Sequence, residues 1–310
     1  MAIDIKEQQI LDLNENLLSL LLFDHSTKEN IKWATETYLC HGNNYSPESP
    51  ICIEQITGVN TDIIQPRISK TSEEQFKRTK VNAEVFTPSW VCNKQNNLID
   101  EQWFGRKNIF NTPKGESWVS IQEPITFPAN HTWMEYVDLK RMEITCGEAP
   151  YLVSRYDTVT GKEIPVENRI GLLDRKLRIV NENTSDFDDW YKWAIRAYQS
   201  IYGYEYQGDN VLLARENLLH VFAENMIYKF GYGPNQIHLK KIANIISWNI
   251  WQMDGFSMTA PYSEQAKSGA QTYFDFMEES NEPTLEAIPC IIKDWRANHT
   301  ITVLSMTQEY

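Results

Sequence analysis

The sequence predicts an α/β fold, in which helices pack on a parallel sheet and a helical appendage lies on the N-terminal side. Residues 141–152 have the pattern of a strand, a tight turn and the start of a helix, the layout of a doubly wound α/β domain. Residues 201–205 form a second strand pattern between two helical ones. Apolar side chains recur on one helical face from Ile5 to Leu22, and Ser26 with Glu29 offers a second helix start, so residues 5 to about 37 are expected to be helical and to form the appendage.

At 310 residues the chain is long enough to bury a sizeable core. We divide it into a helical N-terminal region, residues 1–75, and an α/β domain, residues 76–310. Within the second region, residues 103–135 are rich in aromatic residues and proline, and we expect a loop-rich insertion there.

Apolar runs and cysteine spacing predict the compartment of the protein and whether it holds disulfides or zinc. No apolar run is long enough to span a bilayer, and no signal peptide is evident, so we expect a cytoplasmic protein without a membrane partner. The five cysteines are scattered and form no Cys-x-x-Cys pair, which argues against a disulfide framework and a zinc site. They are Cys40, Cys52, Cys92, Cys146 and Cys290. We therefore expect no metal.

The net charge of −13 bears on partners. Proteins that grip DNA through many phosphates normally carry an excess of Lys and Arg. Either a local basic patch exists here, or another chain supplies most of the grip on nucleic acid. The most basic cluster of the first half, Lys77, Arg78 and Lys80, is interpreted as a solvated helix end in preference to a nucleic-acid contact.

The remaining elements follow from local signals. Thr87 and Pro88 before Ser89 predict a helix start, because proline loses no hydrogen bond at the first helical position. Two helices are expected on either side of the second strand, over residues 186–200 and 209–222. Residues 242–253 then form a strand-like or helical run that ends at Asp254.

The turn after the first strand carries the clearest chemical signal. Glu143 lies just before the turn Cys146-Gly147-Glu148-Ala149. A carboxylate there suits an amino group better than a phosphate, and a dinucleotide pyrophosphate prefers a bare helix N-terminus. This favours S-adenosylmethionine (AdoMet), whose methionine moiety carries an amine.

Two further acids follow in the order that a nucleoside site requires. Glu205 ends the second strand, where one carboxylate can accept from two vicinal ribose hydroxyls. Asp254 ends the third predicted segment, where an acid can accept from the adenine amino group. Strand-end acids are also common turn residues, so the order of the three carries more weight than any one of them.

Three segments resemble the N6-adenine DNA methyltransferases of restriction–modification systems, in particular the Eco57I-like enzymes and type I modification subunits. Residues 83–88, Ala-Glu-Val-Phe-Thr-Pro, are similar to the family's Phe-x-Thr-Pro element. Residues 143–149, Glu-Ile-Thr-Cys-Gly-Glu-Ala, are similar to its AdoMet turn, and residues 202–219 to the following strand and helix. The resemblance covers roughly residues 80–256.

The resemblance implies a Rossmann-like AdoMet-dependent methyltransferase sheet, AdoMet as cofactor and DNA as partner. Transfer to the adenine amine would be a direct displacement on the sulfonium, which depends on positioning and needs no metal. The cofactor site that it implies comprises Phe86, Thr87, Pro88, Glu143, Thr145, Cys146, Gly147, Glu205 and Asp254.

The sequence departs from the family at two points. The family's catalytic Asn/Asp-Pro-Pro-Tyr/Phe motif is absent, since no Pro-Pro dipeptide occurs anywhere. The nearest string, Thr259-Ala-Pro-Tyr262, is interpreted as a coincidental turn, so the catalytic residues are not assigned. Ala149 also replaces the family's usual glycine, and its methyl group is expected to crowd the ligand without excluding it.

Three functions therefore stay open. The first is an AdoMet-dependent DNA adenine methyltransferase. The second is a catalytically incomplete subunit or split gene product that acts through a protein partner. Residues 293–301 look like the middle of a larger protein, which favours the second. The third is an unrelated nucleotide-binding α/β enzyme, although the histidines are dispersed and covalent catalysis has no support.

Overall fold

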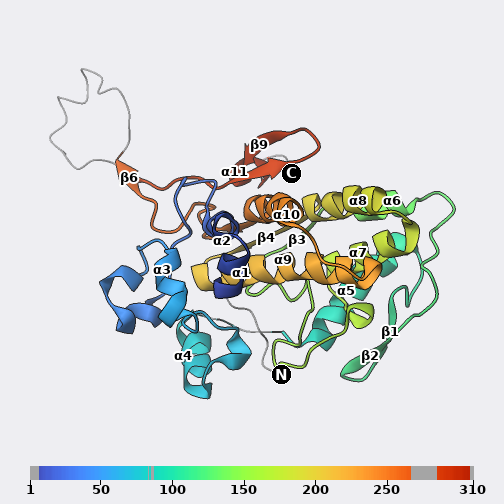
Figure 1. Ribbon diagram of the computed structural model, residues 1–310, viewed down its shortest axis with the longest axis horizontal. Helices are drawn as coiled ribbons and strands as arrows, with labels where there is room; N and C mark the ends of the chain where they lie inside the picture. The colour runs from blue at the N-terminus through green and yellow to red at the C-terminus, as the bar shows by residue number, and fades with distance from the viewer. Residues whose placement is uncertain (1–6, 83, 85–86, 267–284, 308–310) are drawn as a thin grey trace.

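The computed structural model describes residues 7–82, 84, 87–266 and 285–307. At its centre lies a parallel three-stranded sheet in the order β3 (Arg141–Glu143), β4 (Ile201–Glu205), β5 (Ile250–Gln252). Met142 lies opposite Tyr202, and Glu205 opposite Gln252. The mixed α/β class and the parallel sheet are therefore confirmed (Figure 1).

Helical crossovers join the strands, as parallel pairing requires. The first consists of η5 (Val166–Asn168), α7 (Leu172–Asn183) and α8 (Phe187–Gln199), and the second of α9 (Gly208–Phe230) and α10 (Gln236–Asn249). Asp186 caps α8 by accepting from the backbone N–H of Asp189, and α9 ends at Gly231 in the left-handed conformation. Both predicted helices are confirmed, and α9 extends beyond the expected residue 222.

Arg215 on α9 ties the sheet to three helices. Its fully buried guanidinium donates to the backbone carbonyls of Leu21, Phe23, Ser247 and Ile250 over 2.6–3.2 Å. Leu21 and Ser247 lie in the last turns of α2 and α10, Phe23 directly follows α2, and Ile250 begins β5. Carbonyls at helix ends have no partner within the helix, so one side chain satisfies several buried polar groups.

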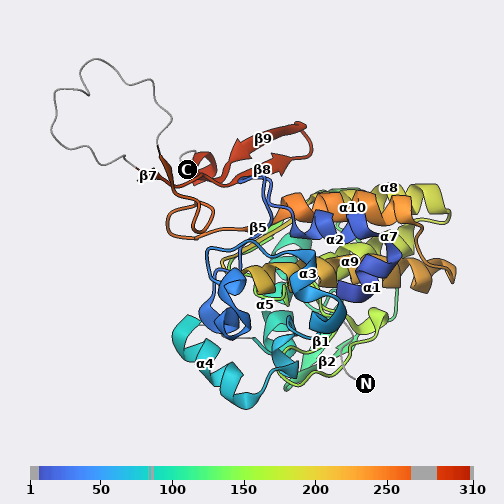
Figure 2. The same cartoon turned by 60° about the vertical axis from the view of Figure 1, so that its left-hand side comes forward.

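The N-terminal helices are shorter than the sequence predicts. They are α1 (Glu7–Leu13) and α2 (Glu15–Leu22), and they pack against α9 and α10 (Figure 2). The expectation of helix to about residue 37 is wrong, because the Asp24 carboxylate accepts from the backbone N–H groups of Ser26 and Thr27 and turns the chain. Short elements follow: η1 (Glu36–His41), η2 (Asn43–Tyr45), α3 (Ile53–Ile56), η3 (Gly58–Asn60), η4 (Arg67–Ser69) and α4 (Ser72–Asn82).

The remaining elements flank the sheet. The predicted helix at Ser89 is α5 (Ser89–Phe104). Residues 103–135 include the antiparallel hairpin β1 (Asn111–Lys114) and β2 (Ser117–Ser120) and the start of α6 (Trp133–Asp138). Near the C-terminus lie the strand pair β6 (Gln265–Ala266) and β7 (Leu285–Glu286), the hairpin β8 (Ile291–Asp294) and β9 (His299–Thr302), and α11 (Val303–Thr307). No helix in the described ranges is long and apolar enough to cross a membrane.

Candidate functional site

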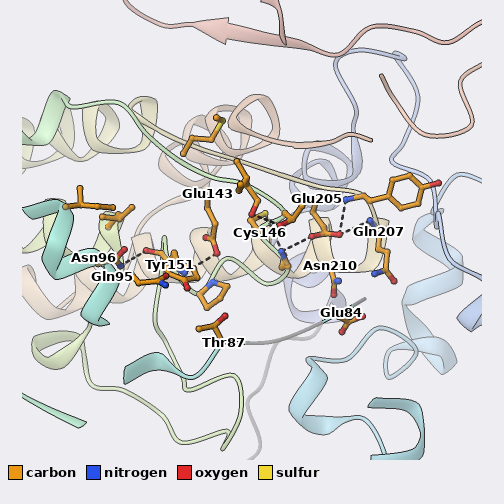
Figure 3. Close-up of a pocket in the computed structure, with 18 of the residues that line it drawn as sticks. Glu84, Thr87, Gln95, Asn96, Glu143, Cys146, Tyr151, Glu205, Gln207 and Asn210 are labelled. Atoms are coloured by element: carbon orange, nitrogen blue, oxygen red, sulfur yellow. Dashed lines mark hydrogen bonds between the residues drawn. The ribbon is translucent and has the colours of Figure 1, made fainter. Parts of the chain in front are cut away.

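A cavity of about 990 Å³ opens at the carboxyl ends of β3 and β4. This edge is where open α/β sheets bind their ligands. Figure 3 shows Glu143 and Glu205 at the sheet side of this cavity, with Thr87 and Glu84 across from them. Helix α5 supplies the wall at Asn96, and the start of α9 supplies the wall on the other side.

The turn after β3 has an unusual backbone. Thr145, Gly147 and Ala149 all have positive φ angles, of 46°, 52° and 64°. Two of the three are not glycine, and such conformations cost on the order of 1–3 kcal/mol each. The turn persists because the Glu143 carboxylate accepts from the backbone N–H groups of Tyr151 at 3.3 Å and Leu152 at 3.2 Å.

Glu205 joins this turn to the start of α9. One carboxylate oxygen accepts from the backbone N–H of Gly147 at 2.9 Å, and the other accepts from Tyr206 at 2.9 Å and Gln207 at 3.2 Å. Burial raises the pKa of the Glu205 carboxyl, although these hydrogen bonds oppose the shift. Burial likewise raises the pKa of Glu143 well above its usual value, and the nearby charge of Glu205 adds to that shift.

The described lining of this cavity is acidic and contains no Lys, Arg or His. Its carboxylates are Glu84, Glu143 and Glu205. The wall also holds two buried acceptors that have no hydrogen-bond partner among the described residues, Asn96 Oδ1 and Asn210 Oδ1, whereas the Glu84 carboxylate is in ion pairs with Arg67 and Arg78. A buried acceptor without a partner is costly, so this wall favours a ligand that is cationic and rich in N–H or O–H donors.

The structure brings most of the predicted site residues together. Six of the nine line the cavity: Thr87, Glu143, Thr145, Cys146, Gly147 and Glu205. Pro88 is the N-cap residue of α5 and lies outside the lining, and Phe86 lies outside the described residues. Ala149 is fully buried in the hydrophobic core and does not line the cavity, so its methyl group does not crowd a ligand there.

Asp254 lies outside the lining as well. Its carboxylate accepts from the backbone N–H of Phe256 at 2.8 Å and closes a local turn. The turn places Phe256, which is fully exposed, against the cavity. Asp254 therefore orients Phe256 in the cavity wall, because its carboxylate accepts the hydrogen bond that closes the turn.

Sequence reasoning missed several lining residues. Asn96, Asn210 and Tyr151 come from helices or from the far end of the turn. Glu84 was also missed. The sequence indicates only two of these residues, through their proximity to the motifs: Glu84 lies within the Phe-Thr-Pro segment, and Asn210 follows the strand that ends at Glu205. A polar residue on a helix can face solvent, another helix or a cavity, so only tertiary packing decides which of them line this cavity.

One residue of the basic cluster of α4, Arg78, forms ion pairs with carboxylates in and next to the cavity wall. Arg78 is buried, pairs with Glu84, and binds the Asp209 carboxylate at 2.8 Å, while Tyr38 donates to the same carboxylate at 2.7 Å. The interpretation of this cluster as a solvated helix end is wrong for Arg78, although Lys77 and Lys80 are exposed. Arg78 faces inward because two buried carboxylates require a counter-charge.

Comparisons with known proteins identify no relative. No family model, no curated protein and no solved structure matches the chain. Within the described ranges, no three His, Cys, Asp or Glu side chains are grouped so that they could hold a metal ion. The chemistry of the cavity therefore carries the functional argument.

Proposed function

We propose that this protein binds AdoMet in the cavity at the end of its parallel sheet, and acts as a DNA adenine-N6 methyltransferase-like protein of a restriction–modification or related defence system. The observation that carries the proposal is the acidic cavity whose described lining contains no cationic side chain. AdoMet has a sulfonium, an ammonium, ribose hydroxyls and an adenine amino group, which are the groups that such a wall favours.

The residues present fit this cofactor. Glu143 would hold the methionine ammonium and Glu205 the ribose hydroxyls. Both carboxylates already accept backbone N–H groups, which fixes their positions. One oxygen of Glu205 accepts two N–H groups, whereas its other oxygen and both oxygens of Glu143 accept one each and retain a second lone pair for a ligand. AdoMet supplies an electrophilic methyl group, and the chain would contribute positioning and charge.

A dinucleotide or a nucleoside triphosphate fits less well. Phosphates bind backbone N–H groups at helix N-termini or the side chains of Lys and Arg. Here the N–H groups of Tyr206 and Gln207 at the start of α9 donate to Glu205, and that of Gly208 donates to the Trp33 carbonyl. Three of the donors that a phosphate would use at the start of this helix are thus occupied.

An incomplete subunit is the second candidate, and the Thr259-Ala-Pro-Tyr262 string favours it. The backbone N–H of Asp254 donates to the Thr259 carbonyl, and Thr259 pairs with Pro289 in an isolated bridge. None of the four residues lines the cavity. This string therefore does not stand in for the family's catalytic motif at the cavity, and in an incomplete subunit a partner would supply that motif.

Calorimetry with AdoMet, and with ATP and NAD as comparators, tests the proposal. We expect AdoMet to bind at least 10-fold more tightly than either comparator, a difference of about 1.4 kcal/mol. Absence of AdoMet binding would contradict the proposed function. A second assay follows labelled methyl transfer to adenine-containing DNA, with fully N6-methylated DNA as control. Binding without transfer supports the incomplete subunit, and transfer by the chain alone supports the active enzyme.

A further inference from the structure

The outer edge of β3 has no partner strand. The sheet order places β3 at one margin, paired with β4 alone within the described chain. The backbone N–H groups of Arg141 and Cys146 donate toward β4, to the carbonyls of Ser200 and Tyr204. Because backbone groups alternate sides along a strand, those of Met142 point away from β4, and no described residue bonds to them.

The opposite margin of the sheet is treated differently. The chain beyond β5 folds back over it, and the Cys290 thiol lies 3.4 Å from the carbonyl of Gln252. Trp251 and Met253 are buried in a second apolar cluster with residues of the β8–β9 hairpin. The protein therefore covers one margin of its sheet and leaves the other open within the part of the chain that is described, although an open edge is a template for pairing.

An apolar surface accompanies the open edge. Met142 is 49% exposed and Ile144 is 63% exposed. Both border the cavity that holds Glu143, as does Ile99 of α5. Apolar residues that gather in one place, beside unpaired backbone, mark an interaction site more strongly than the same residues scattered singly.

The topology points to what belongs at this edge. The strands β3, β4 and β5 advance in one direction from β3. In a doubly wound sheet the ligand crevice lies where the strand order reverses, between the first strand and a neighbour on its other side. Here Met142 in β3 and Ile144 just after it line the cavity, so the cavity borders the strand beside which that neighbour would lie.

Charge selects the kind of partner. The chain carries a net charge of −13, so a second copy would bring a like net charge against it. A protein that handles DNA needs a surplus of Lys and Arg, which this chain lacks. A basic protein would be attracted to this acidic chain and would also supply the Lys and Arg that DNA binding requires.

We propose that the outer edge of β3 binds an edge strand of a second, basic protein, in parallel with β3, and that this strand completes the sheet and closes the cavity. The choice of a basic partner rests on the proposed function, because it assumes that the protein acts on DNA. The choice of the β3 edge rests on its unpaired backbone and on the apolar surface. Main-chain hydrogen bonds to the edge would supply affinity, and Met142 and Ile144 would supply the apolar contact.

Site-specific photocrosslinking in the native host tests where the partner binds. A benzophenone amino acid replaces Met142 or Ile144 in the full-length chain, and exposed Leu13 and Val119 serve as control positions. We expect one discrete product from positions 142 and 144, absent from the controls, that contains a polypeptide with more Lys and Arg than Asp and Glu. Absence of that product, or a product that contains only this chain, would overturn the proposal.

Hydrogen exchange and a proline variant then test the binding mode with the identified polypeptide, purified. The amides of Met142 and Ile144 should exchange at least 10-fold more slowly in the complex. Met142→Pro should weaken binding at least 10-fold, and Met142→Ala, which keeps the N–H and loses only the apolar contact, should weaken it by a smaller factor than Met142→Pro. Proline is tolerated where the lost N–H faced solvent, so the variant is expected to fold. Unchanged exchange, or full binding by the proline variant, would overturn strand pairing. Neither readout requires AdoMet, so failure in calorimetry would be distinguishable from failure here.

Discussion

The backbone N–H of Gly147 donates to the carboxylate of Glu205 across 2.9 Å, which fastens the turn after β3 to the end of β4. The two residues are 58 positions apart in the chain. The contact uses the positive φ of Gly147, which aims its N–H at the neighbouring strand. One hydrogen bond thus fixes the shape of the cavity between the two carboxylates that we assign to AdoMet.

Replacing Glu205 with glutamine should impair both the site and the fold. The glutamine amide keeps one acceptor oxygen, but its NH₂ group would face a backbone N–H that now has no acceptor. We expect AdoMet affinity to fall at least 10-fold and the free energy of unfolding to fall by about 1–3 kcal/mol. Calorimetry and urea denaturation measure the two effects, with exposed Glu48→Gln as the control. Wild-type affinity in Glu205→Gln would remove Glu205 from the proposed site.

Asp254 offers a contrasting test, because its carboxylate closes a turn outside the lining. Asp254→Asn keeps the acceptor oxygen and removes the charge, so AdoMet affinity should change less than threefold. Asp254→Ala should lower the free energy of unfolding by about 1 kcal/mol, since the turn loses its hydrogen bond to Phe256. A 10-fold loss of affinity in Asp254→Asn, measured by calorimetry, would show that the charge acts on the ligand after all.

The buried guanidinium of Arg78 should be required for stability. Arg78→Met removes the closest counter-charge of the buried carboxylates of Asp209 and Glu84 and leaves each only a more distant cation, at 3.5 Å and 3.9 Å, so we expect a loss of about 3 kcal/mol in the free energy of unfolding. Lys77→Met on the exposed side of the same helix should change it by less than about 0.5 kcal/mol. Chemical denaturation compares the two variants. Equal, small effects would contradict the structural role of Arg78.

Stability should depend on pH through a buried acid on α1. Burial raises the pKa of Glu7 from 4.5 to about 8, and the charge of Asp62 adds to the shift. Burial, and then Glu7, also raises the pKa of Glu216 on α9. A carboxyl with a raised pKa holds its proton in the folded state, so its contribution is complete below about pH 4.5 and is lost as pH rises through 8.

Glu7→Gln imitates the protonated form and should flatten this dependence. The slope of the free energy of unfolding between pH 5 and 8 should decrease by up to about 1 kcal/mol per pH unit. Urea denaturation across that range measures the slope, with Glu48→Gln as the matched exposed variant. Identical slopes in wild type and Glu7→Gln would mean that Glu7 is ionised in the folded protein.

The sequence by itself determined the local elements. Helix α8 with its Asp186 cap, strand β4, helix α5 and the turn after Glu143 follow from periodicity, capping residues and turn formers, which act over a few positions. One local signal gave a wrong prediction, since Ser26 with Glu29 indicates a second helix start, whereas the Asp24 carboxylate turns the chain there.

Tertiary structure alone decided how distant segments meet. The pairing of β3 with β4 brings Gly147 to Glu205, and packing of α5 and α9 selects Asn96 and Asn210 as wall residues. The burial of Arg78 depends on carboxylates from two other segments. Such outcomes arise from long-range packing and from the cost of leaving buried polar groups without partners, and neither is encoded in a short stretch of sequence.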